Sequence, residues 1–175
     1  MKEFTFTDAT PLIEFVEKNS HRVVGQTLVS LYTDCWPVKG GYMTSENPIV
    51  IELEDYCIVV NYFLISSLTI EIASKEELKA HNYLKSLLQI KDRVNDYYNK
   101  EFDRGEDKES IEGCKITKIS VERFSEQFEY NLEGDIRPEG GDYFSTIRIY
   151  LDGGTIFCIC GAPAVLDGWV YIWCE

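Results

Sequence analysis

Positive charge is scarce in this sequence. Its 175 residues include 17 lysines and arginines against 30 aspartates and glutamates, which gives a formal net charge of −13 at pH 7. A protein that holds phosphate groups needs clustered basic side chains to release counterions, so a chain this acidic is repelled by DNA, RNA and anionic lipid. We therefore expect no direct binding to nucleic acid or to a membrane surface.

Histidine is almost absent, since His21 and His81 are the only two. This limits the general-base and metal chemistry that relies on imidazole near neutral pH. The sequence also has no Gly-x-Ser-x-Gly elbow, no phosphate-binding loop with its lysine and no His-Glu-x-x-His motif. We expect no cofactor, and a non-enzyme is favoured, although many catalytic sites lack a local motif.

Long apolar runs are also missing. The longest, from Cys57 to Ile65, is interrupted by Asn61 and has about half the length that a membrane-spanning helix needs. The first residues show no basic segment followed by an apolar run, which argues against a signal peptide. These features predict a cytoplasmic protein.

What the chain does contain is enough apolar material for a core. Hydrophobic residues make up 45% of it, and surface scaling predicts that about 70% of the surface of a chain this size is buried on folding. We expect one domain over residues 1–175. Residues 101–113 carry six carboxylates against two basic groups and two glycines, which is typical of an exposed acidic connection.

Two helices are predicted from their start signals. Thr10 and Pro11 open an apolar segment that we expect to be helical over residues 10–19. Ser74 and Glu77 form a capping box before an apolar repeat of three- and four-residue steps, which predicts a long amphipathic helix over residues 75–100.

Alternating polar and apolar residues predict strands elsewhere. The alternation places Val23, Thr27, Val29 and Leu31 on one face of a strand over 22–33, and it leaves 34–47, with Trp36-Pro37 and Gly40-Gly41, as a loop. Further strands are expected at 49–51 and 56–63 as a hairpin, at 68–72 with one face exposed, at 117–121, at 128–132, at 143–151 and 155–160 around the turn 152–154, and at 168–174. The predicted fold is α+β, with a mostly antiparallel sheet of about seven to nine strands packed on the long helix.

The six cysteines are expected to be free thiols, because a chain with this much core needs no disulfides. Cys158 and Cys160 share one face of a strand, and Cys174 could lie on a neighbouring strand, so these three are weak candidates for a metal or redox site. The spacing lacks the paired motif of zinc sites, and buried packing is the favoured interpretation.

Aromatic side chains are plentiful, and Trp169, Tyr171 and Trp173 share one parity of the last strand. Such a stripe is usually core, here covered by the long helix, but it would mark a binding site if it were exposed. The candidate residues for binding a partner or ligand combine aromatic residues of the 34–47 segment with carboxylates at predicted strand ends or turns: Asp34, Trp36, Tyr42, Glu54, Asp55 and Asp142.

Two functions are weighed first, and a structural or homo-oligomeric component that pairs through an exposed strand edge is a third possibility. The charge excess favours a binding protein that steers and neutralises a basic protein partner, since opposite charge accelerates encounter and discriminates among partners. This size and charge are also those of small bacterial immunity proteins, which is a likeness of composition only. The alternative is a small-molecule-binding protein, or a hydrolase without a motif, with a pocket between the long helix, the sheet and the Trp36 loop. Many proteins are acidic merely for solubility, and a monomer or a homodimer is expected.

Overall fold

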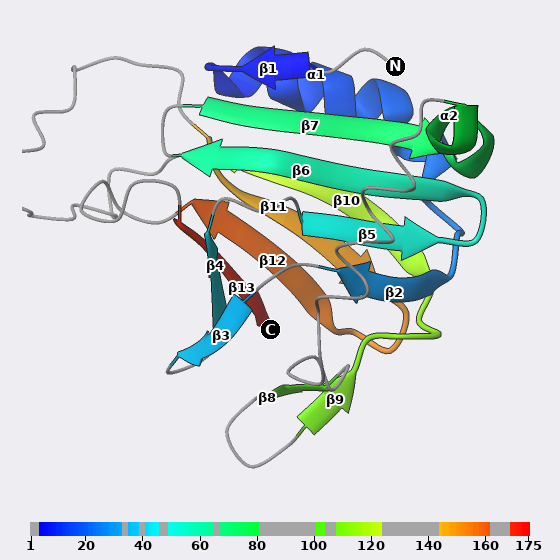
Figure 1. The fold of residues 1–175 in the computed structure, drawn as a ribbon, viewed down its shortest axis with the longest axis vertical. Helices are drawn as coiled ribbons and strands as arrows, with labels where there is room; N and C mark the ends of the chain where they lie inside the picture. Colours follow the sequence, from blue (N-terminus) through cyan, green and yellow to red (C-terminus); the bar gives the residue numbers. More distant parts are fainter. Residues whose placement is uncertain are drawn as a thin grey trace, which may run out of the picture.

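The computed structural model describes residues 4–32, 35–38, 41–45, 49–64, 67–80, 101–103, 108–123, 144–161 and 169–175. Strands dominate these residues, and two layers of sheet face each other with helix α1 lying across one end (Figure 1). The elements, in chain order, are β1 (Phe4–Phe6), α1 (Ala9–Asn19), the 3-10 turn η1 (Ser20–Arg22), β2 (Leu28–Tyr32), β3 (Cys35–Val38), β4 (Gly41–Ser45), β5 (Ile49–Leu53), β6 (Tyr56–Leu64), β7 (Ser67–Ser74), α2 (Lys75–Ala80), β8 (Glu101–Asp103), β9 (Lys108–Ser110), β10 (Ile116–Arg123), β11 (Phe144–Leu151), β12 (Ile156–Gly161) and β13 (Trp169–Cys174).

The strands of the described residues form three antiparallel sheets. One has five strands in the order β1-β7-β6-β5-β2, and a second has six in the order β10-β11-β12-β13-β4-β3. A small third sheet pairs β8 with β9. The α+β class and the antiparallel pairing are confirmed. The expected sheet of seven to nine strands is not, because the strands divide between two facing sheets.

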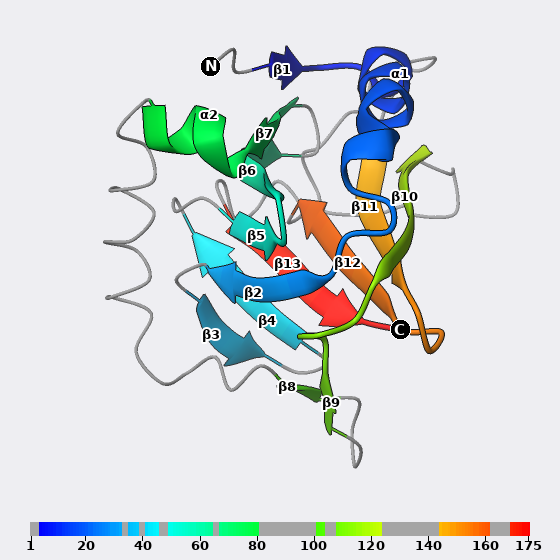
Figure 2. The ribbon, with the colours of Figure 1, turned by 90° about the vertical axis from the view of Figure 1, so that its right-hand side faces the viewer.

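The two large sheets join along one edge through main-chain hydrogen bonds. The residues that enter β2 meet those that enter β10: Gly25 donates to the Ile116 carbonyl at 2.7 Å and Leu28 to the Cys114 carbonyl at 2.8 Å. Thr27 and Lys115 form a bridge between these bonds. Figure 2 shows β2 and β10 meeting on the same side of the molecule. The two large sheets are therefore joined along one edge by residues 25–28 and 113–116, and we call this junction the seam.

The core fills the space between the sheets. Alternate residues of β5, β6 and β7 face alternate residues of β11 and β12, and Phe157 is the largest side chain that is fully buried there. From α1, Ala9, Leu12 and Val16 enter the same cluster. Packing of this kind supplies most of a domain's stability, because each buried aliphatic side chain contributes roughly 1.5–3 kcal/mol.

The five-stranded sheet is buried on its other face as well. Val50, Val59 and Glu71 form one row across β5, β6 and β7, and none of them is more than 6% exposed. The sequence predicted one exposed face for residues 68–72, so this prediction is wrong. Alternation of polar and apolar residues does not report burial here, because the row that contains Thr69 and Glu71 is also covered.

The N-terminal helix is confirmed, since α1 spans Ala9–Asn19. The long helix begins where expected, at Lys75 after the Ser74 cap, but only its first six residues are described. Residues 81–100 of the predicted helix, and the predicted strand at 128–132, lie outside the described residues. The hairpins at β5–β6 and β11–β12 are confirmed, and Gly153 and Gly154 take φ of +91° and +94° in the second turn.

Three local predictions are corrected. In β2, Leu28 and Leu31 are buried whereas Val29 is 41% exposed, because the pairing with β5 shifts register between Leu28 and Ser30 and reverses the alternation. The expected loop at 34–47 contains the β3–β4 hairpin. The expected acidic connection at 101–113 contains β8 and β9, and Ile111 belongs to the core with 1% exposure.

Candidate functional site

The turn between β5 and β6 carries two of the predicted site residues, Glu54 and Asp55. Both are exposed. The Thr27 amide donates to Glu54 Oε2 at 3.2 Å, and the Gln26 side chain accepts from the Asp55 amide at 2.9 Å and donates to Asp55 Oδ2 at 3.3 Å. The segment before β2 therefore holds both carboxylates in place while leaving them in contact with solvent.

Helix α2 starts beside this turn. The Lys75 amide donates to the Asp55 carbonyl at 2.9 Å, which places the first turn of α2 next to the β5–β6 turn. Glu76 and Glu77 are exposed in that first helical turn. We call Glu54, Asp55, Glu76 and Glu77 together the acidic end of the molecule.

The capping box that begins α2 keeps Glu77 ionised. The Ser74 amide donates to Glu77 Oε2 at 2.7 Å, and the Glu77 amide donates to Ser74 Oγ at 3.1 Å. Hydrogen bonding to the Ser74 amide, and then to its hydroxyl, lowers the pKa of Glu77 below its ordinary value of 4.5. A carboxylate at a helix N-terminus is also favoured by the helix dipole.

Two basic side chains border the acidic end. Lys75 Nζ lies 3.0 Å from Glu52 Oε1, so this lysine forms an ion pair with a residue of β5. Arg22 donates to the Ile72 carbonyl at 3.2 Å and lies over the Tyr56 ring, 5.9 Å from its centroid. Among the side chains that the structure describes here, the four exposed carboxylates outnumber these two cations, so this group carries a net negative charge.

The aromatic candidates do not join this group. Trp36 lies in β3, at one edge of the six-stranded sheet, and Tyr42 lies in the adjoining β4. Trp36 pairs with Met43, whereas Tyr42 pairs with Ile172 on the opposite face of the same sheet. Asp34 and Asp142 lie outside the described residues.

The register also separates the three candidate cysteines. Cys158 pairs with Trp173, whereas Cys174 pairs with Phe157 on the face that enters the core. Residues that pair directly share a face, and successive residues alternate. The register therefore places Cys158 and Cys160 on one face of the sheet and Cys174 on the other. Among the described residues, no cluster of three metal-ligating side chains is present.

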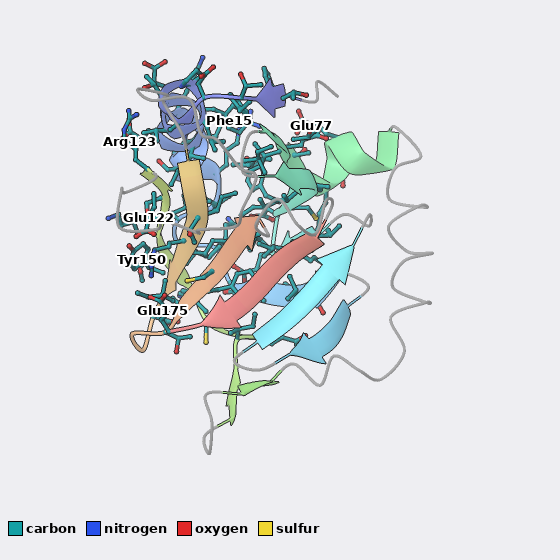
Figure 3. The ribbon with its side chains drawn as sticks, turned by 90° about the vertical axis from the view of Figure 1, so that its left-hand side faces the viewer. Phe15, Glu77, Glu122, Arg123, Tyr150 and Glu175 are labelled. Carbon is teal, nitrogen blue, oxygen red and sulfur yellow. The ribbon has the colours of Figure 1, made fainter. Side chains whose placement is uncertain are left out.

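Arg148 organises the outer face of the six-stranded sheet, by which we mean the face turned away from the core. Its Nε lies 2.8 Å from Glu122 Oε1, and its Nη1 pairs with Glu175 Oε2 and lies 3.8 Å from Cys158 Sγ. The carboxylates of Glu175 and then Glu122 raise the pKa of Arg148 further above its ordinary value. Figure 3 shows Glu122 and Glu175 on the β10–β11 side of this sheet.

Cys57 is the buried thiol of the five-stranded sheet, and it is 3% exposed. Burial, and then the negative charge of Glu52, raises its pKa from 9.0 to about 11. A thiol is nucleophilic only as the thiolate. Cys57 is therefore an inert packing residue at neutral pH.

Sequence reasoning found the β5–β6 carboxylates but missed Glu76, Glu77 and Arg148 as parts of charged groups. The capping box identified Glu77 as a helix-start residue, and nothing local placed α2 beside the β5–β6 turn. The Arg148 network joins residues 122, 148 and 175, and only the strand register brings these together.

Comparison of the chain with protein-family models, with curated proteins and with solved structures found no match. None of the helices in the described part of the chain is long and apolar enough to span a membrane.

Proposed function

We propose that this chain is a non-catalytic binding protein, of the immunity or inhibitor type, that neutralises a basic protein partner at its acidic end. The observation that carries the proposal is the grouping of four exposed carboxylates from two separate elements, the β5–β6 turn and the first turn of α2.

The surface charge supports a basic partner. Among the side chains that the structure describes, nine exposed residues are Asp or Glu and four are Lys or Arg. A field of one sign raises the encounter rate with an oppositely charged protein and disfavours acidic competitors.

The rigidity of the acidic end supports recognition as well as attraction. Glu54, Asp55 and Glu77 are each held by hydrogen bonds to neighbouring main-chain or side-chain groups. Carboxylates that are already ordered lose less side-chain entropy when a cation binds them, which preserves more of the binding free energy.

The small-molecule alternative remains a second hypothesis. It requires a pocket between the long helix, the sheet and the Trp36 segment. Trp36 lies on an edge strand instead of a loop, and the helix is described only as far as Ala80.

The proposal is tested with the protein as bait. Proteins retained from cell lysate at about 50 mM salt and released at about 500 mM are identified by mass spectrometry, and the best candidate is purified for kinetic measurements. Glu76→Lys reverses an exposed charge at the acidic end. Glu14→Lys makes the same change at an exposed position on α1 and serves as the matched control.

We expect Glu76→Lys to slow association several-fold and to flatten its salt dependence, and Glu14→Lys to do much less. Equal association rates for Glu76→Lys and the unaltered protein, or an affinity that does not change with salt, would contradict a role of the acidic end.

A further inference from the structure

Residues 25–27 form the exposed part of the seam, and we call this segment the strap. Figure 2 shows it between η1 and β2, beside β10. Val23 and Leu28, on either side of the strap, are each 0% exposed and belong to the core, whereas the three strap residues are exposed or half-buried. The strap is thus anchored at both ends and buries little apolar surface. Segments of this kind open at a lower free energy than the core around them.

On one side the strap bonds to the six-stranded sheet. Gly25 donates to the Ile116 carbonyl at 2.7 Å, and the Ile116 amide donates to the Gln26 carbonyl at 3.0 Å. Thr27 and Lys115 form the bridge that continues this pairing. These contacts are made by the main chain and depend on the position of residues 115 and 116.

The β11–β12 turn holds that part of the chain in place. The Lys115 amide donates to Asp152 Oδ1 at 2.6 Å, and the Asp152 amide donates to the Lys115 carbonyl at 2.8 Å. Asp152 is exposed. Bonds through Lys115 therefore connect the strap to the β11–β12 turn.

On its other side the strap bonds to the acidic end. The Gln26 side chain accepts from the Asp55 amide at 2.9 Å and donates to Asp55 Oδ2 at 3.3 Å. The Thr27 amide donates to Glu54 Oε2 at 3.2 Å. Gln26 and Thr27 thus contact both large sheets, and a movement of their main chain that breaks the contacts on one side also disturbs those on the other.

We propose that the strap opens and closes as one unit, and that it thereby couples the β11–β12 turn to the acidic end. The open strap releases Glu54 and Asp55 from the bonds that order them. A basic partner that binds the ordered carboxylates therefore favours the closed strap, because a ligand shifts an equilibrium toward the state that it binds better. This last consequence rests on the proposed function, whereas the coupling between the two turns does not.

Amide hydrogen exchange of the full chain, measured by NMR, tests the coupling in the free protein. Asp152→Ala removes the acceptor of the Lys115 amide and makes no change at the acidic end. We expect the Asp55 amide to exchange about fivefold faster, the effect of losing roughly one net hydrogen bond from the closed state. Asp152→Asn keeps an oxygen acceptor and is the matched control, with an expected change of less than about twofold.

Gln26→Ala tests the coupling in the reverse direction, since coupling between two sites is reciprocal. It removes the side-chain bonds to Asp55, and the Ile116 amide, which bonds to the Gln26 main chain, should exchange about fivefold faster. The amide of Ile58, a core residue of β6, reports global unfolding and is the internal reference. Faster exchange confined to the bond that each variant removes would overturn the proposal, as would strap amides that always exchange at the rate of the reference.

Tetralysine at low salt is the probe for the link to the acidic end. Changes in the chemical shifts of the Glu54 and Asp55 amides report its binding. Bound tetralysine should slow exchange of the Gly25 and Ile116 amides by about twofold or more, because it stabilises the closed state by mass action. Binding without slower exchange overturns the link between the strap and the acidic end. Absence of binding contradicts the proposed function instead, and the two alanine variants then decide whether the strap is one unit.

Discussion

Ser74 and Glu77 cap each other reciprocally: the Ser74 amide donates to the Glu77 carboxylate, and the Glu77 amide donates to the Ser74 hydroxyl. The pair marks where β7 ends and α2 begins. It also fixes Glu77 in the acidic end, so a stability measurement on this pair checks the local geometry on which the proposed function depends.

Ser74→Ala should lower the free energy of unfolding by about 1 kcal/mol, as expected for loss of a helix N-cap. Urea denaturation at pH 7 measures this. Ser74→Thr retains a hydroxyl and serves as the control. Equal losses in the two variants would mean that the hydroxyl is not the capping group.

The carboxylate half of the same cap should be sensitive to pH. The folded-state pKa of Glu77 lies below its ordinary value of 4.5. The contribution of the Glu77 carboxylate to the free energy of unfolding is therefore present above pH 4.5, and it is lost as the pH falls through the lowered folded-state pKa. The difference in unfolding free energy between the unaltered protein and Glu77→Gln should therefore shrink as urea titrations move from pH 7 toward pH 3. A difference that stays constant over this range would argue against the charged cap.

The irregular register of β2 makes a clear prediction about two adjacent residues. Leu28 is 0% exposed and Val29 is 41% exposed, so Leu28→Ala should cost about 2–5 kcal/mol through lost burial and a cavity. Val29→Ala should change stability by less than about 1 kcal/mol. A larger loss of stability for Val29→Ala than for Leu28→Ala would mean that Val29 faces the core, as simple alternation predicts, and would contradict the register shift between Leu28 and Ser30.

Cys57 should resist alkylation in the folded protein. Its pKa of about 11 leaves almost no thiolate at pH 8, and the side chain is 3% exposed. Brief treatment with iodoacetamide followed by peptide mass spectrometry should modify the half-buried Cys114 ahead of Cys57. Rapid labelling of Cys57 without prior unfolding would be incompatible with this environment.

The same thiol contributes to alkaline denaturation. A folded-state pKa raised from 9.0 to about 11 means that the unfolded chain ionises first. The stabilisation is therefore complete below pH 9 and is lost as the pH rises toward 11. Cys57→Ala, compared with the unaltered protein in urea at pH 8 and pH 10.5, should lose less stability over that interval, and an equal loss in both would assign the pH effect to other groups.

The turn between β11 and β12 depends on two glycines with positive φ. Nothing lies within 4 Å of a Cβ built at Gly153 or Gly154, so alanine there is opposed by backbone strain alone, at about 1 kcal/mol or more each. Gly153→Asn should cost less, because asparagine tolerates positive φ better than alanine. Thermal denaturation of the three variants gives the order.

Elements with a local signal could be predicted from the sequence. The Ser74 cap predicted the start of α2, Pro11 predicted α1, and the glycines at 153 and 154 predicted a hairpin. The predictions that failed concern strands whose conformation depends on partners far away in the sequence. The shift in β2 arises from its pairing with β5, and β3 and β4 form a strand pair at the edge of a sheet that β13, over a hundred residues later, helps to build.

The candidate site shows the same division. Glu54 and Asp55 were predicted at a turn because acidic residues separate two apolar runs, and they are there. Their neighbours in α2, and the pairing of Arg148 with Glu122 and Glu175, follow from three-dimensional packing alone. No spacing rule in one sequence connects residues so far apart along the chain.

The seam between the two large sheets has a consequence for how the chain folds. Residues 25–28 bond to residues 113–116, so the seam closes a loop of about ninety residues, at an entropic cost on the order of 4 kcal/mol before any constant term. During synthesis, β2 can pair with β5 long before its other partner has left the ribosome. The seam should therefore be among the last contacts to form, and folding should be slow for a chain of this length because so many contacts are distant in sequence.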